Sequence, residues 1–246
     1  MYINKGIVKV RLLPLLLYVE TNMKIIALSD LHGNLDKIYD SCDVVVIAGD
    51  WSPLYCQHDA YSILNWWDRK FIPWMKQIDT SHIVIIPGNH DLACTLSFFK
   101  SELDTILKRN KVENEVHYLC HDSIIINGKK FYGNPNSESP RCWAFSNPYN
   151  VNYDFDDDTD VLITHQPPRF GNIGFVRQTN REFGSVDLRN KILDSNISLN
   201  ICGHIHTGEH GCHSIILNNG NEARVYNVSI LDEDYRVAYK PTVIEL

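Results

Sequence analysis

The sequence lacks the excess of basic side chains that a nucleic-acid-binding surface needs. Its 246 residues contain 23 Lys and Arg against 30 Asp and Glu, which gives a formal net charge of -7. A broad face that binds phosphates requires the opposite balance, so we expect no stable nucleic-acid partner. A small anionic substrate remains compatible with this charge, because bound metal cations reverse the local field.

The cysteines lack the pattern of a disulfide framework or of a cysteine-rich zinc site. They are seven in number and no two of them form a C-x-x-C pair. They are Cys42, Cys56, Cys94, Cys120, Cys142, Cys202 and Cys212. Free thiols are typical of a reducing compartment, so we predict a cytoplasmic location.

The N-terminal segment lacks an apolar run long enough to cross a bilayer. The run from Leu12 to Val19 is short and is broken by Pro14. A secretory signal is the alternative, but Glu20 and Thr21 follow where a small-residue cleavage pattern would stand. We therefore predict no membrane partner. We interpret residues 1–22 as an N-terminal extension, explained most simply by a start assigned upstream of Met23, and residues 23–246 as one domain.

The rest of the composition is that of a globular protein, with 44% hydrophobic and 22% charged residues. Apolar runs rich in Val and Ile predict strands that are covered on both faces. The predicted strands are 24–28, 44–48, 83–87, 123–126, 161–164, 199–202, 214–217 and 224–228. Helical patterns cover 60–78, 96–109 and 187–193, and Pro73 is expected to kink or divide the first of them. This order indicates a layered α/β domain with a mixed sheet, or two sheets packed between helices.

Five short polar signatures each follow an apolar run directly. They are Asp30-Leu31-His32-Gly33-Asn34, Gly49-Asp50, Gly88-Asn89-His90-Asp91, Thr164-His165 and Gly203-His204-Ile205-His206. Ligands of open α/β folds bind beyond the carboxyl ends of strands, so we expect these signatures to surround one site. Carboxylate, imidazole and amide groups without a thiolate suit Mn, Fe, Zn or similar divalent ions. One such signature alone is usually a surface loop, whereas five in order predict a metal centre.

The order D-x-H, G-D, G-N-H-D, H and G-H-x-H resembles the calcineurin-like metallophosphoesterase superfamily, from about Met23 almost to the C-terminus. The resemblance implies a four-layer αββα sandwich, in which two mixed sheets are flanked by helices. It also implies two divalent metal ions. One would be held by Asp30, His32, Asp50 and His206, and the other by Asp50, Asn89, His165 and His204, with Asp50 as the bridge.

A narrower resemblance is to the metallophosphoesterase-domain-containing branch, which is related to class III cyclic-nucleotide phosphodiesterases. It is carried by Gly133-Asn134-Pro135, Trp143-Ala144-Phe145, Thr164-His165-Gln166-Pro167-Pro168 and Asn227-Val228-Ser229. Gln166 stands where the branch usually has glycine. For Trp143 and Phe145 we predict core packing rather than stacking on a base.

Two divalent ions, manganese foremost in vitro, would activate a water to hydroxide and clamp phosphoryl oxygens. In the resemblance His90 is the catalytic histidine, which protonates or stabilises the leaving oxygen, and Asn89 and His90 lie at the substrate. Asp91 has two open interpretations. It could orient His90, or it could cap a helix that begins near Leu92.

These features predict a phosphodiesterase that hydrolyses small phosphodiesters, with cyclic nucleotides as one candidate class. A phosphomonoesterase or protein phosphatase is the alternative. Gly49-Asp50-Trp51-Ser52-Pro53-Leu54 departs from the G-D-x-x-D-R-G of phosphoprotein phosphatases, which disfavours that branch. A repair nuclease is disfavoured by the acidic balance and the short length. A binding scaffold without catalysis is the third hypothesis, although His90 and every ligand position are filled.

Overall fold

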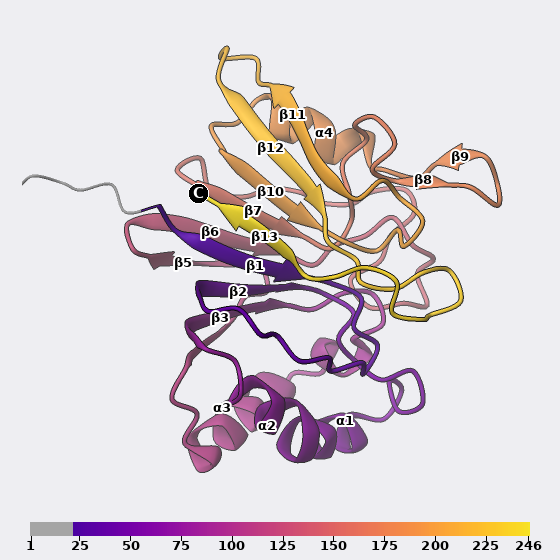
Figure 1. Cartoon of the computed structure of the whole chain (residues 1–246). Coiled ribbons are helices and arrows are strands. Elements are labelled where there is room, and N and C mark those ends of the chain that lie inside the picture. Colours follow the sequence, from indigo (N-terminus) through magenta and orange to yellow (C-terminus); the bar gives the residue numbers. More distant parts are fainter. Residues whose placement is uncertain (1–21) are drawn as a thin grey trace, which may run out of the picture.

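The computed structural model describes residues 22–246, which form two mixed β-sheets stacked face to face (Figure 1). The predicted extension at residues 1–22 lies outside the described residues except for its last position. In the first sheet the strand order is β13-β1-β2-β3-β4. Its bounds are β1 Lys24–Leu28, β2 Cys42–Ala48, β3 Thr80–Ile86, β4 Glu115–Tyr118 and β13 Thr242–Glu245. Strands β1 to β4 are parallel, and β13 pairs with β1 in the antiparallel direction.

The second sheet has the order β11-β12-β10-β7-β6-β5. Its bounds are β5 Asp122–Ile126, β6 Lys129–Asn134, β7 Val161–Thr164, β10 Leu199–Cys202, β11 Gly211–Ile216 and β12 Glu222–Asn227. The four inner strands are parallel, and antiparallel partners close both edges. A small hairpin of β8 (Phe175–Val176) and β9 (Arg181–Glu182) projects from the loop side (Figure 1).

Helices cover the outer face of each sheet (Figure 1). On the first sheet these are α1 Ala60–Trp66, the π-helical turn Trp67–Phe71, α2 Ile72–Met75, the 3-10 helix Leu92–Thr95 and α3 Phe99–Asn110. The second sheet carries α4, Val186–Leu193. None of the helices in the described part of the chain is long and apolar enough to cross a membrane.

The buried side chains form three apolar layers, which is the four-layer αββα arrangement that the sequence predicted. Along β3, Ile83 and Ile85 pack under the helices of the first sheet, whereas Val84 and Ile86 pack between the two sheets. A third layer, between the second sheet and α4, contains Leu188. Because successive strand residues point to opposite faces, a strand buried on both sides is apolar throughout.

The predicted helix at 60–78 forms with a division at its middle. The apolar side chains spaced three and four residues apart along it, from Leu64 to Ile78, are buried, and Trp67 and Phe71 are fully enclosed. Pro73 has no backbone N–H, and the turn before it widens so that the N–H of Ile72 bonds to the carbonyl of Trp67, five residues earlier. The π turn therefore accommodates Pro73 while the helical segment stays packed against the first sheet.

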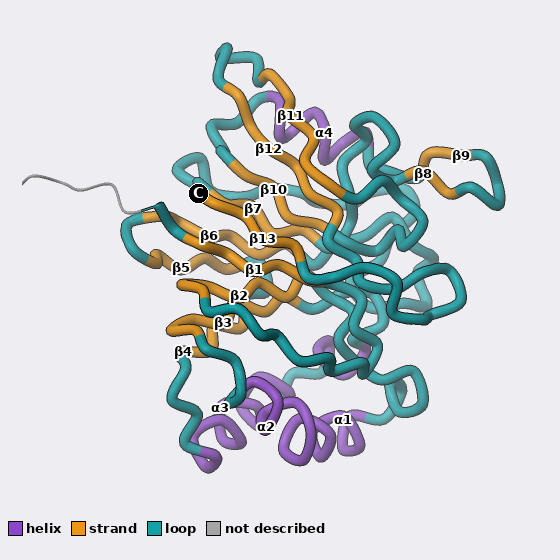
Figure 2. Tube along the Cα trace, viewed as in Figure 1, coloured by secondary structure: helices purple, strands orange, loops and turns teal. Residues whose placement is uncertain are grey.

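The carboxyl ends of β1, β2, β3, β7 and β10 open toward the same side of the molecule, where the long loops gather (Figure 2). The two sheets are joined at this end. The N–H of Ser29 donates to the carbonyl of Val228 at 2.9 Å, and the N–H of Ile230 donates to the carbonyl of Ser29 at 3.1 Å. The five predicted signatures are thereby brought around one point between the sheets.

Candidate metal centre

The chain turns sharply at three of the five strand ends that carry a signature, those after β1, β2 and β10. Four predicted ligands have a left-handed backbone, with φ of 57° at Asp30, 41° at His32, 52° at Asp50 and 70° at His204. Residues other than glycine seldom adopt this conformation, which costs on the order of 1–3 kcal/mol each and clusters at functional sites. The surrounding structure therefore holds these four side chains in strained positions that aim them at one place.

Glycines in the signatures allow this crowding. A Cβ on Gly88 would lie 2.3 Å from Oδ1 of Asp50 and 2.8 Å from Cε1 of His165. A Cβ on Gly49 would lie 2.4 Å from Nδ1 of His165. Any larger residue at either position would displace the side chains of the site.

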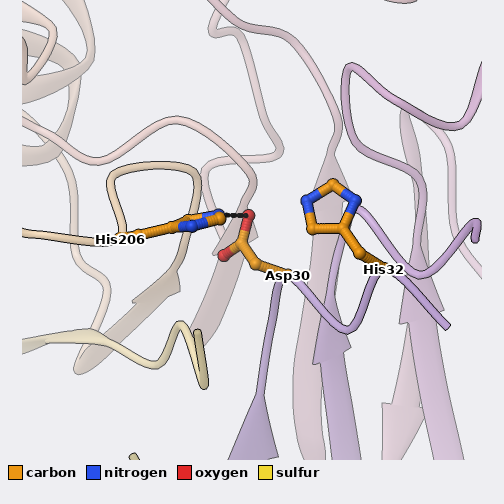
Figure 3. A group of neighbouring side chains, drawn as sticks. All are labelled: Asp30, His32 and His206. Atoms are coloured by element: carbon orange, nitrogen blue, oxygen red, sulfur yellow. Dashed lines mark ion pairs between the residues drawn. The ribbon is translucent and has the colours of Figure 1, made fainter. Parts of the chain in front are cut away.

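One group of side chains consists of Asp30, His32 and His206, shown in Figure 3. Nε2 of His206 lies 3.4 Å from Oδ1 of Asp30. Nδ1–H of His206 donates to the carbonyl of Asp232 at 2.9 Å, which directs Nε2 at the carboxylate. Metal-binding histidines characteristically donate their second ring nitrogen to a backbone carbonyl or carboxylate in this way.

A second group consists of Asp50, His165 and His204. Nε2 of His165 lies 3.3 Å from Oδ2 of Asp50 and 2.9 Å from Oδ1 of Asn89. The other nitrogen, Nδ1, donates to the carbonyl of Ala48 at 2.9 Å. His165 therefore shows the same two-sided arrangement as His206.

Asp50 lies between the two groups. Its Oδ2 is 3.7 Å from Nε2 of His32 and 3.3 Å from Nε2 of His165. Its Oδ1 accepts the backbone N–H of His90 at 2.8 Å. Every ligand position implied by the sequence is thus brought into one cluster, with Asp50 at its middle.

Burial and neighbouring charge lower the pKa of two of the four imidazoles and raise the pKa of the other two. Burial lowers the pKa of His32 to about 4 and that of His204 to about 3. Burial acts in the same direction on His165 and His206, but the carboxylates of Asp50 and Asp30 outweigh it and raise the pKa of both to about 9. Burial would raise the pKa of the two carboxyls, yet the histidines facing them hold each pKa well below its usual range.

The arrangement fits divalent cations. Both ring nitrogens of His32 are buried and have no hydrogen-bond partner within residues 22–246. Nε2 of His165 faces two oxygen acceptors at once. Buried polar atoms left unpaired cost about 1–3 kcal/mol each, and cations among these donors would remove that cost. Four imidazoles, two carboxylates and an amide oxygen are a set that suits Mn, Fe or Zn.

His90 is held at the edge of this cluster by a residue that the sequence did not point out. Its Nδ1–H donates to Oε1 of Gln57 at 2.7 Å. The ring centroid lies 4.3 Å from that of Trp143 and 4.8 Å from that of His32. Trp143, which we predicted to pack in the core, is half-buried and packs against His90. These contacts fix the His90 ring beside His32 and Asp50, and its Nε2 makes no hydrogen bond to another of the residues 22–246.

The contacts of Asp91 match neither of the two roles predicted for it, orienting His90 or capping the next helix. Its carboxylate accepts the backbone N–H groups of Asp50 and Ser52 at 2.9 Å and of Gly88 at 2.7 Å. The side chain makes no capping bond to the 3-10 helix that follows, and Gln57 contacts His90 instead. Burial and the charge of Asp50 raise the pKa of Asp91 to about 7. We therefore reassign Asp91 from a catalytic residue to one that fixes the backbone around Asp50.

Tyr235 is a second residue of the site that no signature indicated. Its ring centroid lies 5.0 Å from that of His32 and 5.2 Å from that of His206. The turn that carries it, φ 60° at Tyr235, is fixed by Asp232, whose Oδ1 accepts the N–H groups of Asp234 and Arg236 at 2.9 Å each. A half-exposed aromatic side chain therefore borders the first group of predicted ligands.

Comparison with known proteins places the chain among metallophosphoesterases. Residues 23–208 match the family model described as calcineurin-like phosphoesterase. Metallophosphoesterase domain-containing protein 1 of Homo sapiens is 25% identical over 248 residues, which cover 91% of this chain and 71% of the relative, and the Mus musculus protein gives the same values. A UPF0046 protein of Caenorhabditis elegans is 25% identical over 243 residues, with 90% and 74% covered.

The fold also matches a solved structure, the crystal structure of phosphopantetheinyl hydrolase from Mycobacterium tuberculosis. The TM-score is 0.50 at 14% sequence identity, over 91% of this chain and 95% of that one. A likeness at this identity supports the fold alone. The relatives confirm the expected resemblance to the metallophosphoesterase-domain-containing branch. The chain therefore belongs to the calcineurin-like phosphoesterase family, whose members are metal-dependent phosphoesterases.

Proposed function

We propose that this protein is a dinuclear metal-dependent phosphodiesterase that hydrolyses small phosphodiesters, with cyclic nucleotides as one candidate class. The observation that carries the proposal is that Asp50 joins two groups of buried ligands, each completed by histidines fixed from behind by a backbone carbonyl. One ion would be held by Asp30, His32, Asp50 and His206. The other would be held by Asp50, Asn89, His165 and His204.

When bound, two divalent ions supply Lewis acidity to the phosphoryl oxygens and activate water near neutral pH. The protein keeps the site electropositive toward a phosphate ester. Asp30 and Asp50 contribute two negative charges against the four of two divalent ions, and Asn89 adds a ligand without further negative charge.

His90 is the proposed proton donor to the leaving oxygen. Gln57 accepts from its Nδ1–H, so Nε2 is the atom available for proton transfer. Burial lowers the pKa of His90, so the protonated donor, and with it the rate, should increase as the pH falls below neutral. Trp143 and His32 limit the tilt of the ring, which positions Nε2 before a substrate arrives. Asn89 and His90 are also proposed to contact the substrate.

We prefer a phosphodiester to a phosphomonoester as the substrate because of the sequence of the second signature. Phosphoprotein phosphatases continue this signature as G-D-x-x-D-R-G, whereas Trp51-Ser52-Pro53-Leu54 follows Asp50 here.

The test compares two chromogenic esters on metal-stripped protein reloaded with manganese. Faster hydrolysis of bis-p-nitrophenyl phosphate than of p-nitrophenyl phosphate supports the diesterase and leads to cyclic nucleotides as the next substrates. Faster hydrolysis of the monoester moves the assignment to a phosphatase. Metal binding without hydrolysis of either ester would favour a binding scaffold.

We further propose that the physiological partner is a small phosphate ester rather than a nucleic acid or a membrane, and that the protein acts in the cytoplasm. The net charge of -7 and the free cysteines support these proposals.

A further inference from the structure

We propose that His82, Glu115 and His117 form a third divalent-cation site, of the zinc class, at the outer edge of the first sheet. The site lies apart from the dinuclear centre. His82 stands near the start of β3, whose far end leads to Asn89, and β4 carries the other two residues as the edge strand (Figure 2).

Strand register brings the three side chains to one face. In the parallel pair β3–β4, His82 lies beside Glu115 and Val84 lies beside His117. Side chains two residues apart on a strand point to the same face, so all three share the face on which Val84 packs between the sheets. At the edge strand this face ends, and the two imidazoles keep 20% and 17% of their side-chain surface exposed. A cation and a water ligand can therefore reach them.

The three donor atoms form a nearly equilateral triangle. Nδ1 of His82 is 3.2 Å from Nε2 of His117, and Oε2 of Glu115 is 3.6 Å from the first atom and 3.9 Å from the second. A point among three atoms at these separations lies about 2.1 Å from each, which is the bond length of zinc to histidine nitrogen and carboxylate oxygen.

Hydrogen bonding alone explains only one side of this triangle. The two imidazole nitrogens are close enough for an N–H···N bond, but the carboxylate oxygen is beyond hydrogen-bond distance from both rings. The carboxylate lies at ion-pair distance from both rings, and a shared cation would join all three groups at once.

Two imidazoles and one carboxylate with an open fourth position are a zinc ligand set. Bound there, the ion would clip the edge strand β4 to β3, because its ligands come from both strands. It would stabilise the folded chain by mass action without touching the phosphoesterase site.

The test measures zinc content and thermal stability of the full chain after metal stripping and reloading. We expect the double variant His82→Asn/His117→Asn to bind one zinc ion fewer than the parent, to lose part of the zinc-dependent rise in Tm, and to keep the parent's rate of diester hydrolysis. His121→Asn is the matched control. It removes an exposed imidazole outside the triangle, at a φ of 54° that asparagine tolerates.

Equal zinc content in the parent and the double variant would overturn the proposal. If the double variant does not fold, Glu115→Gln replaces it, since that side chain is 69% exposed. Glu115→Gln should weaken zinc binding at this site about tenfold or more, because it replaces a charged ligand by a neutral one. Unchanged affinity in Glu115→Gln would likewise reject the site.

Discussion

At the scale of single residues, the site depends on groups that support the predicted ligands from behind. Asp91 binds three backbone amides around Asp50, and Gln57 holds the ring of His90. Neither role involves a metal or a substrate directly. Supporting contacts of this kind set the orientation of ligands and of proton donors, and their loss weakens activity without removing the reacting group.

His90→Ala should keep the metal content of the parent and lower kcat by about a hundredfold or more, because it removes the proposed proton donor. Metal analysis and diester kinetics on the same preparation test this. A variant as fast as the parent would remove His90 from the mechanism.

Gln57→Leu should lower kcat by about tenfold with metal content unchanged, because it removes the acceptor that orients His90. Gln57→Glu keeps an acceptor and adds a negative charge beside the ring, so it should raise the pKa of His90 and extend activity to higher pH. The pH profile of kcat separates orientation from loss of folding. Identical profiles for the parent and Gln57→Glu would show that Gln57 does not act through His90.

The motifs predicted which side chains meet, since their spacing after strands is local information. They could not predict Gln57 or Tyr235, which reach the site through loops and not through a motif. The role of Asp91 could not be predicted from its position next to His90, because the carboxylate accepts backbone N–H groups up to 41 residues away in the sequence.

At the scale of elements, five strands position the metal centre, because each ends in a loop that carries one of the signatures. They are β1, β2, β3, β7 and β10. The left-handed turns at Asp30, Asp50 and His204 are possible because glycine or a short loop lies next to them and leaves room for the neighbouring chain. Buried strands and the helix at 60–78 were predictable because they are apolar on a clear period. Strands β4, β6, β8, β9 and β13 were not predicted. β6 is an inner strand, but its apolar residues are only Phe131 and Tyr132, which follow two lysines and precede Gly133. β8 and β9 have two residues each. β4 and β13 are edge strands, and in β13 only Ile244 is a buried apolar residue.

Gly88→Ala should weaken metal binding and lower activity by about tenfold or more, because the added methyl group would press on Asp50 and His165. Gly220→Ala is the control. A methyl group there meets nothing within 4 Å, at a φ of 87°, so it should cost about 1 kcal/mol of stability and leave metal binding unchanged. Isothermal titration with manganese compares the two variants. Equal affinities would contradict the packing argument.

At the scale of the whole molecule, two sheets of parallel inner strands meet so that five carboxyl ends face one point. The αββα arrangement was predictable from the order of the motifs through the family resemblance. The pairing of the sheets through Ser29 was not predictable, since it joins residues 200 positions apart. This joint places His206 and its carbonyl partner Asp232 beside Asp30.

Metal binding should release roughly two protons per chain at pH 7, because His165 and His206, with pKa raised to about 9, are protonated in the metal-free protein and neutral as ligands. Such raised values stabilise the metal-free fold fully below pH 6.5, and this stabilisation is lost as the pH rises through 9. Calorimetric titration in buffers of different ionisation enthalpy counts the protons. An apparent enthalpy independent of buffer would contradict the assignment.

The most direct test of the central claim is to measure manganese content and diester hydrolysis in parallel on the parent chain and on Asp50→Ala. The carboxylate of Asp50 faces His32 of the first group and His165 of the second, so its removal should empty the dinuclear centre and abolish hydrolysis. An Asp50→Ala protein with the parent's manganese content and normal turnover would contradict a dinuclear centre bridged by this carboxylate.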